Sequence, residues 1–341
     1  MNLKKRIRVL VVDDSIVFRE VLSRGIASDP NIEVVAMASD PFDARDKIIK
    51  YRPDVMTCDV EMPKMNGIEF IKRLMPQYPL PVVVVSTVSE AVFRAMAAGA
   101  VDFVSKPDAK SDKSLNAFTS ELVIKIKIAS AANVANREPG NIRNLISGNS
   151  RDTSIQIIAI GASTGGTEAI FSILKCFPES VPGIVIAQHI PASFSRMFAD
   201  RLDNSTRLKV REARTGDYVE RGHVLIAPGD EHMRIKKAGD KYRVECFKGD
   251  KVNGHCPSVD VLFESVAKEA GCCSVGVILT GMGYDGARGL LSMKRKGART
   301  IGQNAESSVV YGMPKVAYDI GGVEKQAALC DMPRVIYSML G

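Results

Sequence analysis

A serine stands in a glycine-rich turn near the middle of the chain. The stretch GASTG, which holds Ser163, satisfies the pattern G-x-S-x-G and comes directly after the apolar run IQIIAI. Glycines on both sides let the backbone turn sharply, and the helix predicted to follow offers free N–H groups and its positive dipole end to an oxyanion. The pattern is typical of a nucleophile on a strand-to-helix bend.

Other interpretations of this turn predict different chemistry. A P-loop needs lysine after the paired glycines, where Thr167 stands, and a dinucleotide site needs G-x-G-x-x-G, which the stretch lacks. A purely structural turn remains an alternative, because G-x-S-x-G by itself is weak evidence of catalysis. The choice depends on whether a base and an acid reach the same place.

The chain has four histidines, and one of them has the position of a general base. His189 ends the next predicted strand, GIVIAQH, while His255 lies in the loop KVNGHCPS and is the next candidate. Asp285 follows a further strand in VGVILTGMGYDGARG. Carboxyl ends of parallel strands meet at one sheet edge, so we expect Ser163, His189 and Asp285 to form a triad. Their chain order differs from the Ser, Asp, His order of α/β-hydrolases.

The first half of the chain carries acidic residues at strand ends. Asp13 and Asp14 end the first predicted strand, and Asp59 ends the third. Three carboxylates at one edge of a doubly wound sheet repel one another unless a hard cation binds, so we expect Mg²⁺ there. Ser86 ends the fourth strand, and Lys106 follows the fifth, within reach of phosphoryl oxygens.

Strands and helices alternate along both halves, which predicts parallel sheets. We expect an α/β fold with a doubly wound domain over residues 1–130, a polar linker over 131–153 and a mostly parallel α/β domain over 154–341. The stretch HMRIKKAGDKYRVECF predicts a β-hairpin inserted in the second domain, with its turn at Gly239 and Asp240.

Composition narrows the class of protein. The 341 residues are 45% hydrophobic and 25% charged, as in a soluble globular protein, and no apolar run reaches membrane-spanning length. The seven cysteines suggest neither a disulfide framework nor a zinc site, and the N-terminus does not resemble a signal peptide. We therefore expect a cytoplasmic protein without membrane insertion. A net charge of +7 without a dense basic block gives little support for nucleic-acid binding.

The first half resembles the receiver domain of two-component response regulators. The segments VVDDS, CDVEMPKMNG, VVVVST and DFVSKP stand in that family's order, within about residues 5–127. The resemblance implies a flavodoxin-like (βα)5 fold and phosphorylation of an aspartate with bound Mg²⁺. It assigns the phosphoacceptor Asp59, the metal ligands Asp13, Asp14, Asp59 and Glu61 (through its backbone carbonyl), and the switch residues Ser86, Phe103 and Lys106.

The second half resembles the catalytic domain of the chemotaxis methylesterase family, usually called CheB. The matching segments include IGASTGGTEAI, IAQHIPASFSRMFADRL, VILTGMGYDGARG and ESSVVYGMPKVA. The resemblance implies a catalytic triad of Ser163, His189 and Asp285, with oxyanion donors near Thr164 and Met282 and no cofactor for the esterase. The chain departs from the family pattern at the residues Cys256, Gln303 and Asn304.

Together the two resemblances imply a phosphorylation-activated protein-glutamate methylesterase. Its substrates would be methylated chemoreceptors, from which it would release methanol. Its phosphodonor would be a chemotaxis histidine kinase. The same enzyme would also deamidate receptor glutamines. A response regulator whose second half binds a partner or DNA without catalysis is the alternative class. DNA-binding output domains usually contain a helix-turn-helix and a basic face, whereas this half has an α/β pattern and a candidate triad.

Overall fold

The computed structural model describes residues 5–87, 89–107, 115–134 and 154–340. The chain divides into two compact units, Met1–Arg137 and Glu138–Gly341. Most of the predicted linker, residues 131–153, lies outside the described residues.

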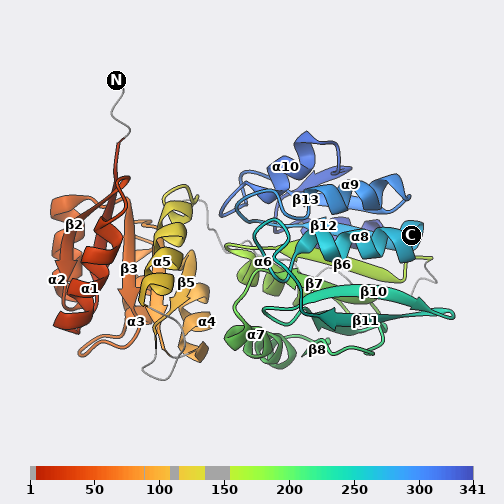
Figure 1. The fold of residues 1–341 in the computed structure, drawn as a ribbon, viewed down its shortest axis with the longest axis horizontal. Helices are drawn as coiled ribbons and strands as arrows, with labels where there is room; N and C mark the ends of the chain where they lie inside the picture. The colour runs from red at the N-terminus through yellow and green to blue at the C-terminus, as the bar shows by residue number, and fades with distance from the viewer. Residues whose placement is uncertain (1–4, 88, 108–114, 135–153, 341) are drawn as a thin grey trace. The chain divides into compact units, whose positions relative to one another are not determined.

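The first unit is a five-stranded parallel sheet in the order β2-β1-β3-β4-β5 (Figure 1). Its strands are β1 (Ile7–Val12), β2 (Ile32–Ala38), β3 (Val55–Asp59), β4 (Val82–Ser86) and β5 (Asp102–Ser105). Its helices are α1 (Ile16–Ala27), α2 (Pro41–Tyr51), α3 (Gly67–Leu74), α4 (Ser89–Ala97) and α5 (Leu115–Ala129). This order is that of flavodoxin-like folds, so the predicted fold of the first half is confirmed.

The start of α1 fixes the carboxyl end of β1. The Ser15 side chain accepts a hydrogen bond from the Phe18 amide and caps the helix. The Ser15 amide in turn donates to Asp13 Oδ1 over 2.9 Å. Asp13, which follows β1, is thus held at the sheet edge by the beginning of the next helix.

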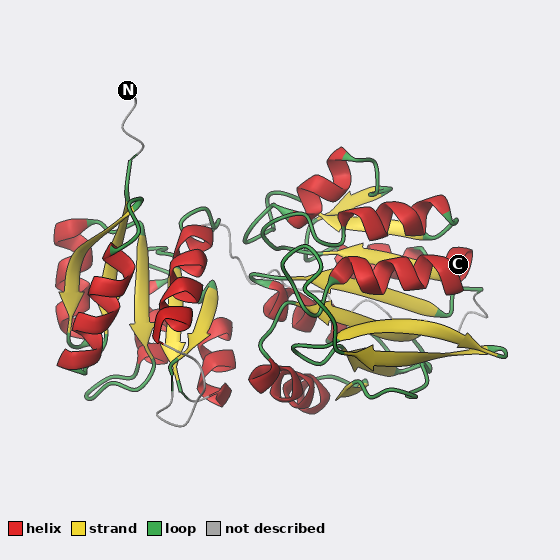
Figure 2. Cartoon of the chain, viewed as in Figure 1, coloured by secondary structure: helices red, strands yellow, loops and turns green. Residues whose placement is uncertain are grey.

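The second unit is a seven-stranded parallel sheet in the order β14-β13-β12-β6-β7-β9-β8. Figure 2 shows the strands of both units in yellow and their helices in red. The strands of the second unit's sheet are β6 (Ile157–Ala162), β7 (Gly183–Gln188), β8 (Lys209–Glu212), β9 (His223–Ile226), β12 (Ser274–Ile278), β13 (Arg299–Gln303) and β14 (Lys325–Ala327). Its helices are α6 (Gly166–Leu174), α7 (Ala192–Ser205), α8 (Val259–Glu269), the 3-10 turn η1 (Gly271–Cys273), α9 (Ala287–Arg295), α10 (Met313–Asp319) and α11 (Met332–Ser338).

The predicted hairpin is also present. The strands β10 (His232–Ala238) and β11 (Lys241–Phe247) pair antiparallel as a separate two-stranded sheet, with Gly239 and Asp240 between them. The hairpin lies beside α8, as Figure 1 shows. The second unit is therefore a parallel α/β domain with a hairpin insertion, as predicted.

Strand β6 lies in the middle of the second sheet and is buried on both faces. Ile157 and Ala159 join a core cluster with Phe263 of α8, and every residue of β6 is buried. A strand enclosed on both sides is a rigid base for the turn that follows it. No helix within the described ranges is both long and apolar enough to cross a membrane.

Candidate active site and phosphoacceptor site

Ser163 and His189 follow neighbouring strands at the same level. The parallel pairing of β6 with β7 ends at Ala162 and Gln188, and each candidate residue comes one position later. The His189 amide donates to the Ala162 carbonyl over 3.1 Å, which extends the ladder by one bond. The register therefore brings the serine and the histidine to one edge of the sheet.

The glycine-rich turn has the geometry that its sequence predicts. Gly165 has φ of +77°, a conformation that glycine adopts without strain, and α6 begins at the next residue. The Gly166 amide donates to the Ser163 carbonyl over 2.7 Å, which closes the turn. On the other side, a Cβ added to Gly281 would lie 2.7 Å from the Ser163 Cβ. The loop after β12 therefore packs directly against the serine.

His189 and Asp285 are hydrogen-bonded to each other. The His189 Nε2 atom lies 2.8 Å from Asp285 Oδ2, and the two side chains are 8% and 1% exposed. The carboxylate also accepts hydrogen bonds from the donors Asn253 Nδ2 (2.8 Å), Ser258 Oγ (2.8 Å), the Val259 amide (2.7 Å) and the Asp260 amide (3.3 Å). Asp285 thus lies at the N-terminus of α8, where a negative charge is stabilised.

The charge of Asp285 determines which nitrogen of His189 can act as a base. Burial raises the pKa of Asp285, but hydrogen bonds from His189 and Asn253 lower it more, so the net pKa lies well below the usual range. An ionised carboxylate only accepts, and the proton must therefore sit on His189 Nε2. This leaves Nδ1 as the basic atom. It is buried and has no hydrogen-bond partner within the part of the chain that the structure describes.

The two residues predicted to supply oxyanion donors belong to segments beside Ser163. Thr164 follows it in the turn, and its carbonyl accepts a hydrogen bond of 3.0 Å from Thr280 Oγ1. Met282 follows Gly281 and is 46% exposed. Gln303 supports this region, because its Oε1 accepts from the Thr280 amide over 2.9 Å. The oxyanion roles stay predictions.

Sequence reasoning missed several side chains that hold this site. Asn253, Ser258 and Thr280 were not singled out, and Gln303 was noted only as a departure from the family pattern. Ser258 has a recognisable signal, since a serine before an apolar periodic run predicts a helix N-cap, and its Oγ accepts from the Val261 amide. Its second bond, to Asp285, depends on a tertiary contact that has no local pattern.

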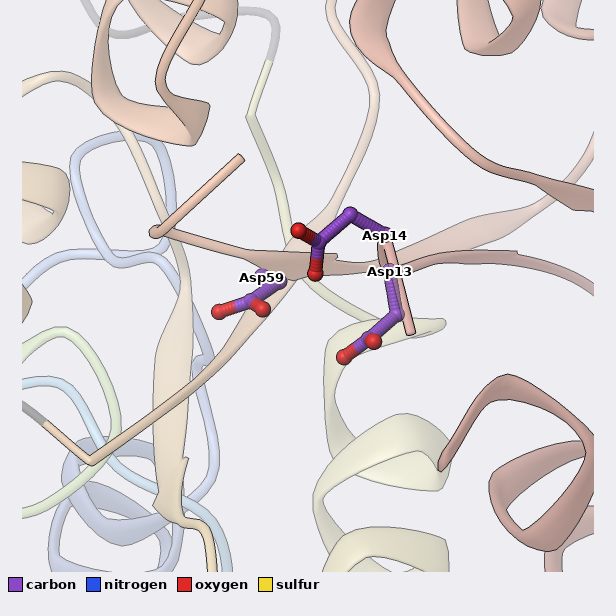
Figure 3. Close-up of side chains that lie close together, drawn as sticks. All are labelled: Asp13, Asp14 and Asp59. Atoms are coloured by element: carbon purple, nitrogen blue, oxygen red, sulfur yellow. The ribbon is translucent and has the colours of Figure 1, made fainter. Parts of the chain in front are cut away.

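In the first unit, three carboxylates converge at the carboxyl ends of β1 and β3 (Figure 3). Oxygen atoms of Asp13, Asp14 and Asp59 lie within 4.8 Å of one another. Lys106 Nζ lies 2.8 Å from Asp13 Oδ2 and 2.5 Å from Asp59 Oδ2. Burial raises the pKa of Asp59 even though Lys106 opposes the shift. Three carboxylates and one ammonium leave two negative charges, so the donor set fits a hard divalent cation.

Of the remaining predicted residues of the first unit, Glu61 follows β3, and Ser86 and Phe103 lie in β4 and β5. The Glu61 amide donates to Asp59 Oδ1 over 3.2 Å. Ser86 is buried at the end of β4, where it pairs with Ser105 of β5. Phe103 is buried in β5, with its ring centroid 6.4 Å from that of Phe93. The structure thus brings the acids and Lys106 together, while the phosphoacceptor, metal and switch roles stay predictions.

Comparisons with known proteins identify both halves. Residues 158–336 match the CheB methylesterase family, and residues 9–115 match the response regulator receiver domain. The protein-glutamate methylesterase/protein-glutamine glutaminase 2 of Syntrophomonas wolfei is 58% identical over 336 residues, which cover 98% of each chain. The protein-glutamate methylesterase/protein-glutamine glutaminase of Escherichia coli K12 is 46% identical over 339 residues, covering 98% of this chain and 96% of that one.

A solved structure agrees with these matches. The crystal structure of the Thermotoga maritima CheB methylesterase catalytic domain is 35% identical, with a TM-score of 0.53, and covers 54% of this chain and 98% of that one. The matched structure corresponds to the second unit. The chain belongs to the CheB methylesterase family and carries a response regulator receiver domain before the esterase domain.

Proposed function

We propose that this protein hydrolyses the methyl esters of glutamate side chains on chemoreceptors and deamidates receptor glutamines by the same chemistry. The observation that carries the proposal is the buried bond between His189 Nε2 and Asp285 Oδ2, at the sheet edge where β6 presents Ser163. Family membership and the activities in the names of the two relatives support the substrate class.

The proposed reaction is acyl transfer through Ser163. His189 Nδ1 takes the hydroxyl proton while the serine oxygen attacks the ester carbonyl, and Asp285 stabilises the imidazolium that forms. The tetrahedral intermediate collapses as Nδ1 returns the proton to the departing methoxy group, and methanol leaves. Water then attacks the acyl-enzyme with the same base. A glutamine side chain follows the same path, with ammonia as the leaving group.

Backbone amides of Thr164 and Met282 are the proposed donors to the oxyanion. Thr164 follows Ser163 in the turn, and Met282 follows Gly281, where an added Cβ would lie 2.7 Å from the Ser163 Cβ. Donors fixed in place before the reaction stabilise the developing charge without reorganisation. The esterase reaction as proposed requires no cofactor.

The receiver unit is proposed to control the esterase by phosphorylation of Asp59. Asp13, Asp14 and Asp59, with the Glu61 backbone carbonyl, would hold Mg²⁺, which neutralises phosphoryl and carboxylate charge. Lys106 would contact the phosphoryl oxygens, since it already binds both buried carboxylates. Ser86 and Phe103 would respond as the switch residues on β4 and β5.

The partners follow from this function. The phosphodonor is proposed to be a chemotaxis histidine kinase, and the substrates are methylated chemoreceptors. All seven cysteines are free thiols, which fits the reducing environment of the cytoplasm, the compartment that we propose.

Methanol release from methylated receptor membranes tests the proposal. We expect release by the intact protein and a loss of about 10³-fold or more in the variant Ser163→Ala. Ser172→Ala is the matched control, because the Ser172 hydroxyl donates to the Glu168 carbonyl within its own helix, α6. Near-normal release by Ser163→Ala would show that another group is the nucleophile.

A further inference from the structure

A tight turn precedes α8 and faces the candidate triad. Val252 and His255 exchange two backbone hydrogen bonds of 3.0 Å, so the turn has two central residues. These are Asn253 and Gly254, with φ of +53° and +84°. Positive φ at both central positions is what a type I′ turn requires, and Asn-Gly is its preferred sequence. The turn is therefore well defined by its own sequence.

The last residue of the turn lies against the base. The rings of His255 and His189 are stacked, with centroids 3.6 Å apart and planes inclined by only 8°. A ring packed face to face prevents the His189 ring from rotating out of the plane in which Nε2 meets Asp285.

Asn253, the first central residue of the turn, contacts Asp285, the acid of the candidate triad. Asn253 Nδ2 lies 2.7 Å from Asp260 Oδ2 and 2.8 Å from Asp285 Oδ1, so each amide hydrogen has its own carboxylate. Both carboxylates are buried, with 4% and 1% of each residue exposed. An amide between two buried acids supplies donors to both and fixes their separation.

We propose that the Val252–His255 turn is the positioning element of the triad, with His255 holding the plane of the base and Asn253 holding the carboxylate. The inference rests on the proposed hydrolase function and extends it to two residues outside the triad. Both act through other residues and have no part in the covalent steps. A single turn thereby fixes two members of the triad, His189 and Asp285, although they follow different strands.

Four substitutions separate positioning from simple folding. His255→Ala removes the stacked ring, whereas His255→Phe keeps a flat ring without a titratable nitrogen. Asn253→Gly removes the amide but keeps a residue that tolerates positive φ. Lys251→Ala is the control, since it changes an exposed side chain immediately before the turn.

Steady-state methanol release from receptor membranes is the first measurement. We expect kcat to fall about 10- to 100-fold in His255→Ala and in Asn253→Gly, with KM unchanged, because misplacing a catalytic group affects the chemical step. His255→Phe and Lys251→Ala should keep the full rate within about threefold. A rise in KM at unchanged kcat would overturn the proposal, as would a His255→Phe variant no better than His255→Ala.

The second measurement does not depend on the ester. With only four histidines in the chain, ¹⁵N-histidine labelling gives ring spectra that can be assigned by substitution. We expect a downfield, slowly exchanging proton on His189 Nε2 in the intact protein and in His255→Phe, broadened in His255→Ala and Asn253→Gly. An unchanged signal in both His255→Ala and Asn253→Gly would overturn the proposal. Intact protein that releases no methanol but shows this pattern would contradict the proposed function and support the positioning role.

Discussion

At the scale of single residues, the candidate site is built around one buried carboxylate. Asp285 accepts hydrogen bonds from five donors in the described residues, and two of them are backbone amides at the start of α8. Every donor points at an oxygen that cannot donate while it is ionised. The arrangement selects both the charge of Asp285 and the tautomer of His189.

We predict that Asp285→Asn loses activity and stability together. The new amide group would face donors, and a buried donor left without an acceptor costs about 1–3 kcal/mol. His189 would also be free to adopt the wrong tautomer, for which a loss of about 10⁴-fold in kcat is typical. Methanol release and urea unfolding measure the two effects. Full activity in Asp285→Asn would remove this residue from the triad.

The depressed pKa of Asp285 also predicts how stability depends on pH. The carboxylate has a lower pKa in the folded state than its ordinary value of 3.8, so the folded state binds this proton less readily. Its contribution is therefore complete above pH about 5 and is lost progressively as the pH falls through 3.8 toward the lower pKa of the folded state. Unfolding of the intact protein and of Asp285→Asn, compared between pH 7 and pH 3, should show a shrinking difference. A constant difference would contradict the shifted pKa.

At the scale of elements, contiguous apolar runs made several strands predictable. The structure has β6 and β7 at the apolar runs IQIIAI and GIVIAQH, because strands buried on both faces need no alternation. Strand β14 was missed, since its three residues Lys325, Gln326 and Ala327 pair with β13 at the edge of the sheet and have no apolar pattern.

In the candidate site, too, the features with a local sequence pattern were predictable and the tertiary contacts were not. Ser163, His189 and Asp285 were predictable because parallel strands end at a common edge. The hydrogen bond from Asn253 to Asp285 could not be predicted, although the Asn-Gly sequence is a strong local signal for the turn itself. That bond joins residues 32 positions apart in different loops, and neither propensity nor periodicity encodes such a contact.

The packing of the β12–α9 loop against the serine turn gives a prediction for Gly281. In Gly281→Ala the new Cβ would lie 2.7 Å from the Ser163 Cβ and 2.5 Å from Met313 Sδ, so the serine must shift. A displacement of about 1 Å can reduce kcat about 10²-fold. Gly249→Ala is the control, because its nearest neighbour would be His232 Cδ2 at 3.3 Å. Equal rates for the two variants would show that the loop yields without moving Ser163.

At the scale of the whole molecule, two complete α/β units share one chain, each with its own sheet and core. The receiver holds three acids and a lysine, and the esterase holds the serine, histidine and aspartate. Control of one by the other requires a free-energy coupling between phosphorylation and hydrolysis, which is typically about 1–3 kcal/mol.

We therefore predict that a small-molecule phosphodonor with Mg²⁺ raises methanol release by the intact protein about 5- to 150-fold. Asp59→Asn should stay at the lower rate, because it lacks the phosphoacceptor carboxylate. A fragment of residues 154–341 should not respond to the phosphodonor. A matching increase in Asp59→Asn would assign phosphorylation to another residue.

The central place of β6 has a consequence for synthesis on the ribosome. One edge of β6 is covered by β7, which follows soon in the chain. The other edge pairs with β12, so Ile157 has no partner until Ser274 has been synthesised. Those 117 positions take roughly 6–25 s to translate at bacterial and eukaryotic rates. Throughout that interval the nascent half-sheet exposes an apolar strand edge, the kind of surface that pairs with other chains. Chains terminated before β12 should accordingly aggregate, whereas chains that have completed β12 should not.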